Sequence, residues 1–81
     1  MRSSRPRIGM PAHEFQVLWS QGRARFDVWR DGVLTGLSSP GRTAAVSLAK
    51  RQAQEESLST GRFIIVTSQL NGKRIVEWEG R

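Results

Sequence analysis

The chain has 81 residues, and its 13 Lys and Arg residues against 7 Asp and Glu residues give a net charge of +6. It contains no Cys, which excludes a disulfide framework and thiolate metal sites, and no apolar run approaches the ~20 residues of a membrane-spanning helix. We therefore expect a small cytoplasmic protein with no membrane partner. The basic balance favours an acidic partner such as DNA or RNA, although solubility alone also accounts for it.

Residues 1–12 form the first compositional unit. They contain two prolines, a glycine and no hydrophobic period, which is typical of a disordered arm. The arm carries Arg2, Arg5 and Arg7, and without them the chain has ten cations against seven acids, a balance of +3. Such an arm can follow a phosphate backbone or be a solvated terminus. We assign residues 13–81 to a single small domain.

A first hairpin is predicted from Phe15 to Arg30, where apolar and polar residues alternate. Gln21-Gly22 is expected to form a two-residue turn, and Arg23 to Arg30 the second strand. The expected apolar pairs are Trp19 with Ala24, Val17 with Phe26, and Phe15 with Val28. A one-residue slip would mix apolar with polar side chains, so the pattern supports this register.

Asp31-Gly32 is a strong signal for a second tight turn, because both central positions of a type I′ turn need a positive φ. A short third strand from Val33 to Leu37 follows, with Leu34 beside Trp29 on one face. The Ser38-Ser39 pair then ends this strand and leads into the next element.

The segment from Pro40 to Leu58 is the only convincing helix. Ser39 is placed to cap it, Pro40 occupies the first helical position, and Gly61 lies just past its end. One stripe of this helix carries Ala45, Val46, Ala49 and Ala53. Because small residues let a helix axis approach a sheet closely, we expect the helix to lie across a sheet built from the flanking strands.

A last hairpin is predicted from Arg62 to Glu79, with Asn71-Gly72 as a type I′ turn. The two-residue loop fixes two sets of pairs, one for each face of the sheet. One set is Thr67 with Val76 and Ile65 with Trp78, and the other is Ser68 with Ile75 and Val66 with Glu77. The first set is the more apolar, so we expect it to face the helix.

The predicted fold class is α+β, an antiparallel sheet of four to five strands with one helix packed on one face. The element order is β-β-β-α-β-β, with the short third strand as the uncertain member. The expected core is Phe15, Val17, Trp19, Phe26, Val28, Val46, Ala49, Ala53, Phe63, Ile65, Val76 and Trp78. The other face of the sheet would be open to solvent, as antiparallel sheets allow.

The sequence offers few residues that could act in catalysis. His13 is the only histidine and lies at the edge of the arm, whereas a catalytic histidine needs a fixed partner on each side. The carboxylates are scattered, and no metal-ligand cluster or glycine-rich phosphate loop occurs. We expect a protein that is not an enzyme, with no cofactor, metal or small-molecule substrate.

One constellation could bind a partner, and it combines arginines with a tryptophan on the open face of the sheet. Cations hold phosphates, and an indole ring can stack on a base. The candidate nucleic-acid-binding residues are Arg2, Arg5, Arg7, Arg23, Arg25, Trp29, Lys73 and Arg74. The alternative is a protein-interaction module or a homodimer that uses the exposed sheet face or an edge strand.

The motifs of both hairpins and of the helix also resemble those of a family of short, uncharacterised bacterial domains. The matching stretches are Phe26 to Gly32, Thr43 to Val46 with Ala49, and Asn71 to Lys73. The resemblance implies a strand–strand–helix–strand–strand layout. It implies no catalytic residues, because no function is established for that family.

Overall fold

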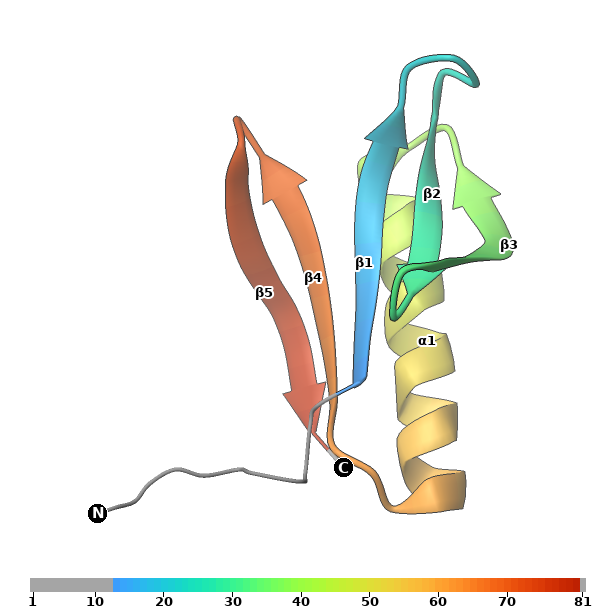
Figure 1. Ribbon diagram of the computed structural model, residues 1–81, viewed down its shortest axis with the longest axis vertical. Coiled ribbons are helices and arrows are strands. Elements are labelled where there is room, and N and C mark those ends of the chain that lie inside the picture. The colour runs from blue at the N-terminus through green and yellow to red at the C-terminus, as the bar shows by residue number, and fades with distance from the viewer. Residues whose placement is uncertain (1–12, 81) are drawn as a thin grey trace.

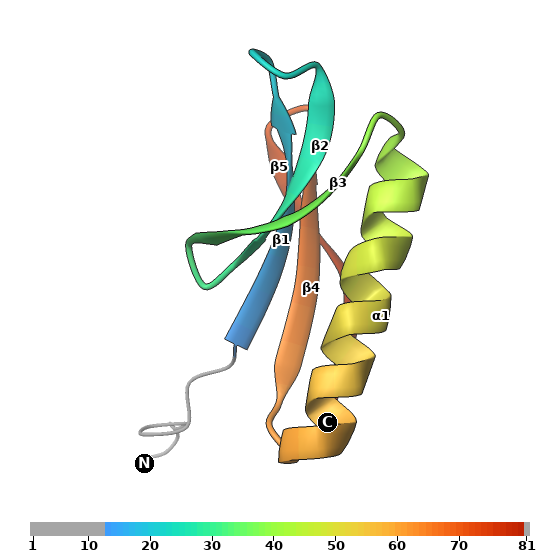
Figure 2. The same ribbon diagram turned by 90° about the vertical axis from the view of Figure 1, so that its right-hand side faces the viewer.

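The computed structural model describes residues 13–80 of the chain. The predicted arm, with Arg2, Arg5 and Arg7, lies outside the described residues. The elements are β1 (His13–Ser20), β2 (Arg25–Arg30), β3 (Val33–Ser39), α1 (Arg42–Thr60), β4 (Ile64–Leu70) and β5 (Lys73–Gly80). All five strands form one sheet in the order β3-β2-β1-β4-β5, and α1 covers one face of it (Figures 1 and 2).

The α+β class and the single helix are as predicted, but the sheet is mixed rather than antiparallel. The hairpin pairs are antiparallel, whereas β1 and β4 pair in parallel, with His13 beside Ile64 and Val17 beside Ser68. A parallel pair needs a long crossover, which the β2–β3 hairpin and α1 together supply here. Residue alternation within each hairpin does not reveal how two hairpins meet, so the parallel contact could not be predicted from it.

Two of the three predicted tight turns are present. Asp31-Gly32 has φ of 50° and 83°, and Asn71-Gly72 has φ of 54° and 77°, as type I′ turns require. The first hairpin differs, because residues 21–24 form its loop and Trp19 pairs with Phe26 instead of Ala24. Gln21 is a poor residue for a type I′ turn, and the longer loop moves the pairing by two residues. A shift of two leaves every side chain on its predicted face.

The third strand extends to Ser39 and pairs with β2 at both of its ends. Trp29 lies opposite Leu34, as predicted, and Arg30 lies opposite Val33. The register then shifts at Val28, near Gly36, whose φ is 92°. The strand is therefore irregular in its middle.

The helix begins two residues later than predicted. Its N-cap is Gly41, which makes no side-chain cap hydrogen bond, and Ser39 Oγ instead accepts a hydrogen bond from the Gly41 N–H at 3.2 Å. The helix ends at Thr60, two residues later than predicted, and Gly61 lies just past its end, as predicted, in the left-handed conformation with φ of 72°. Its N–H donates to the Ser57 carbonyl at 2.8 Å, which closes the last turn.

The core lies between α1 and the sheet, and the alanine stripe of the helix is fully buried in it. The buried apolar residues are Phe15, Val17, Val28, Ala45, Val46, Ala49, Ala53, Ile64 and Val66. Three predicted core residues are largely exposed instead: Trp19 at 53 %, Phe63 at 36 % and Val76 at 48 %. Trp19 lies close to the hairpin tip, and Phe63 precedes β4.

β4 turns the opposite face to the helix from the one predicted, whereas Trp78 of β5 faces the helix as predicted. The pairs Thr67 with Val76 and Ser68 with Ile75 are present. A register shift then leaves Glu77 as an extra residue, so Val66 pairs with Trp78 and both face the helix. Ile65 falls on the other face. β4 lies inside the sheet, and its run of β-branched residues is apolar on both sides, so the sequence does not distinguish its faces.

Candidate nucleic-acid interface

The parallel pairing of β1 with β4 places two hairpin tips at the same end of the sheet (Figure 1). One tip is the β1–β2 loop with Arg23, followed by Arg25 at the start of β2, and the other is the β4–β5 turn, followed by Lys73 and Arg74. We call these four residues the basic tips. The structure thus brings together four of the residues that the sequence analysis selected, from segments almost fifty positions apart in the chain.

The first tip is held by polar contacts on the sheet. Arg25 Nε donates to Ser38 Oγ at 2.8 Å, so this guanidinium lies beside β3. Arg23 Nη2 lies 3.5 Å from Asp27 Oδ1, and the Arg23 side chain is 51 % exposed. Asp27 is only 4 % exposed, and its Oδ1 has no hydrogen-bond partner among residues 13–80. Arg23 is therefore the only cation within ion-pair distance of that carboxylate in the described part of the chain.

The second tip is more open. The Arg74 side chain is 53 % exposed, and its Nε lies 3.4 Å from Glu14 Oε2, which also accepts a hydrogen bond from Thr67 Oγ1 at 2.6 Å. Lys73 is exposed, and it forms no ion pair with any residue that the structure describes. Arg42 lies at the same end, but its Nη2 is bound to Ser68 and Glu77, at 2.7 and 2.9 Å. Lys73 and Arg25 are therefore the cations of this end that no acid neutralises within the described residues.

The tryptophan exposed near the basic tips is Trp19, which the sequence analysis placed in the core. Its ring packs edge-on against Phe26, with 4.9 Å between centroids and 63° between planes, and leaves about half of the residue in solvent. Trp29, the predicted binding residue, is half-buried between Gln16 and Leu34 in the sheet. The position of Trp19 next to last in its strand is the sequence signal that could have identified it.

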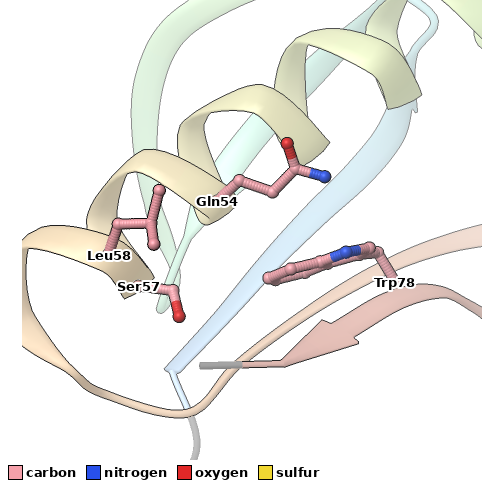
Figure 3. A pocket seen from close by; sticks show the side chains of 4 residues that line it. All are labelled: Gln54, Ser57, Leu58 and Trp78. Carbon is pink, nitrogen blue, oxygen red and sulfur yellow. The ribbon is translucent and has the colours of Figure 1, made fainter.

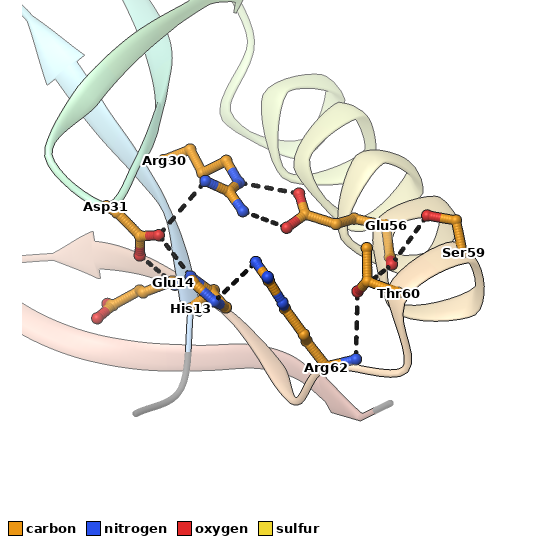
Figure 4. A network of polar contacts seen from close by, with 8 residues as sticks. All are labelled: His13, Glu14, Arg30, Asp31, Glu56, Ser59, Thr60 and Arg62. Atoms are coloured by element: carbon orange, nitrogen blue, oxygen red, sulfur yellow. Dashed lines mark hydrogen bonds and ion pairs between the residues drawn. The ribbon is translucent and has the colours of Figure 1, made fainter. Parts of the chain in front are cut away.

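The opposite end of the sheet also carries charge, but there the charges pair with one another (Figure 4). Arg30 forms a two-pronged contact with Glu56, which ties β2 to α1. Asp31 Oδ2 lies 2.7 Å from His13 Nδ1 and 3.5 Å from Arg30 Nη1. Arg62 Nη1 lies 3.4 Å from His13 Nε2. Because arginine only donates, Nε2 accepts and His13 donates to Asp31 through Nδ1.

The pairing with cations and hydrogen-bond donors shifts the pKa values of Glu56 and Asp31. The hydrogen bond from Arg30 lowers the pKa of Glu56, and the charge of Arg30 adds to that effect against the opposing effect of burial. Burial would raise the pKa of Asp31, but hydrogen bonds from the Glu14 N–H and His13 outweigh it and the pKa is lowered. Both carboxylates are therefore stabilised as anions, and Arg30 is engaged with both of them.

Comparison of the chain with models of known protein families, with curated proteins and with solved structures found no match. The resemblance to short bacterial domains therefore stays a prediction. Within residues 13–80, no group of three or more His, Asp or Glu side chains is placed to hold a metal ion. No helix in that range is long and apolar enough to span a membrane.

Proposed function

We propose that this protein is a cytoplasmic, non-enzymatic module that binds nucleic acid through the basic tips. The observation that carries the proposal is the parallel β1–β4 pairing, because of which Arg23 and Arg25 lie at the same end of the sheet as Lys73 and Arg74. Cations that are free to contact phosphates are the main source of nucleic-acid affinity. At the far end of the sheet, Arg30 is engaged by both Glu56 and Asp31.

The geometry fits a single stretch of nucleic acid that contacts both hairpins. β1 and β4 pair as far as Val17 and Ser68, and beyond that point the two hairpins diverge toward their tips, so the nucleic acid would span the gap between them (Figure 1). Phosphates would lie against Lys73 and Arg25, and an unpaired base could stack on the exposed ring of Trp19. Arg2, Arg5 and Arg7 would add contacts that do not depend on the nucleotide sequence.

The test is fluorescence anisotropy with a labelled mixed-sequence duplex and a labelled single strand, over a series of salt concentrations. The variant is R25Q/K73Q, which removes the two cations that lack an acidic partner among the described residues. The matched control is K50Q/R51Q, which removes the same charge from the helix. If each tip cation contacts one phosphate, the variant's plot of log K against log salt is shallower than the wild type's by about 1.8 for the duplex.

Two outcomes would contradict the proposal. The wild type could fail to bind either probe at low salt, or the helix control could lose as much affinity as the tip variant. The second outcome would mean that net charge alone holds the probe. The stacking role is tested separately by W19A, which should weaken single-strand binding by about 1–3 kcal/mol, or roughly five- to 150-fold, and leave duplex binding nearly unchanged.

A further inference from the structure

Strand β5 forms one edge of the sheet, and its outer side pairs with no strand in the described part of the chain. It runs for eight residues, from Lys73 to Gly80, and Glu77 is its one extra residue opposite β4. The other edge strand, β3, is interrupted in its middle near Gly36. An edge strand presents unpaired backbone N–H and C=O groups, which are a template for another strand. β5 is the more continuous template of the two.

The charges along β5 are divided between its two halves. Lys73 and Arg74 open the strand, and Glu77 and Glu79 lie near its end. Two copies of such a strand that pair in antiparallel fashion bring the basic half of each against the acidic half of the other. We propose that β5 pairs with β5 of a second copy of this chain, so that the two sheets join into one around a two-fold axis.

One register satisfies both faces of the joined sheet. Arg74 and Glu79 pair with Gln69 and Ile65 of β4, so they share the face away from the helix. Ile75 and Trp78 pair with Ser68 and Val66, so they share the helix face. With Arg74 opposite Glu79 of the partner subunit, Ile75 lies opposite Trp78 of the partner subunit. A slip of two residues puts either Val76 opposite Glu79 or Arg74 opposite Glu77, and the Glu77 carboxylate is already bound by Arg42 and Ser68.

The helix side of β5 offers apolar surface for this contact. A hollow of about 300 Å³ lies between the C-terminal half of α1 and the indole of Trp78, lined also by Gln54, Ser57 and Leu58 (Figure 3). Leu58 is 86 % exposed at its rim. A partner strand beside β5 extends the floor of this hollow and brings Ile75 of the partner subunit against Trp78. The interface would then have an apolar side and a charged side.

The experiment is sedimentation velocity of the nucleic-acid-free protein from about 10 μM to about 1 mM, with charge-reversal variants. In R74E, each interface pair becomes Glu against Glu, and in E79R it becomes Arg against Arg. Each variant alone should dimerise at least tenfold more weakly than the wild type, or about 1.4 kcal/mol. An equimolar mixture of the two restores both opposite-charge pairs and should dimerise like the wild type.

R74E places a second carboxylate beside Glu14, so the variant needs a check that it still folds. The mixture supplies this check, because only folded chains can recover the dimer. R51E carries the same charge change on the helix and should leave association unchanged. A wild type that stays monomeric at about 1 mM overturns the proposal, and so does a dimer that both variants retain. A mixture no more associated than its components also overturns it, since the Arg74–Glu79 register then plays no part.

Discussion

The contact between Arg30 and Glu56 fastens the helix to the sheet, and E56Q tests how much it stabilises the fold. Arg30 Nε donates to Glu56 Oε1 at 2.8 Å, and Arg30 Nη2 donates to Oε2. The two side chains are 34 % and 20 % exposed, so the pair is neither fully solvated nor fully buried. A hydrogen bond to a charged group contributes about 1.5–3 kcal/mol, whereas an exposed ion pair contributes about 0.2–1 kcal/mol. We expect E56Q to lower the free energy of unfolding by about 1–2 kcal/mol at pH 7.

The assay is thermal and urea unfolding of the wild type, E56Q, R30Q and the double variant at several pH values. For a domain of this size, the expected loss lowers Tm by roughly 5–15 °C. Because folding lowers the pKa of Glu56, its stabilising effect is fully present above the unfolded value of about 4.3 and is lost as the pH falls through the folded value. The difference between wild type and E56Q should therefore be constant from pH 6 to pH 8 and shrink below about pH 4.5. A Tm of E56Q equal to that of the wild type at pH 7 would refute the reasoning. A stability difference between the two proteins that is as large at pH 3 as at pH 7 would refute it too.

Two further predictions test the fold by matched pairs of substitutions. V66A should lower the free energy of unfolding by about 2–3 kcal/mol because Val66 is fully buried. V76A, at a position that is 48 % exposed, should lower it by about 1 kcal/mol or less. Equal losses in urea unfolding would mean that the faces of the second hairpin are assigned wrongly. G72A should lower the free energy of unfolding by about 1–2 kcal/mol because φ is 77° at this position. G22A should leave it nearly unchanged because Gly22 has no positive φ. Similar Tm values for the two glycine variants would argue against the turn assignment.

Much of the fold could be predicted because local chemistry determines it. Asp31-Gly32 and Asn71-Gly72 need positive φ at both positions, and few residue pairs supply it, so these turns could be located from sequence. The alanine stripe of α1 identified the helix face that packs on the sheet. In the first hairpin, the strict alternation assigned the faces correctly even though the loop is longer than expected.

What could not be predicted depends on contacts between distant segments. The parallel pairing of β1 with β4 follows from how the crossover returns the chain, and no residue pattern within either hairpin encodes it. The extra residue at Glu77 pairs Trp78 with Val66, whereas a count from the turn alone pairs Trp78 with Ile65. For the candidate site, the sequence identified the cations of both tips. It did not show that they lie at one end of the sheet, or that Trp19 is the tryptophan exposed near that end.

The central claim is that the basic tips are the nucleic-acid-binding end of the molecule. The most direct test is a ¹H–¹⁵N NMR titration of the labelled protein with a short mixed duplex and a mixed single strand, at low and at high salt. We expect salt-sensitive shifts at Arg23, Arg25, Lys73 and Arg74 with both probes, and at the indole N–H of Trp19 with the single strand. Shifts confined to residues 1–12 or to the outer face of α1, or no shifts at low salt, would contradict it.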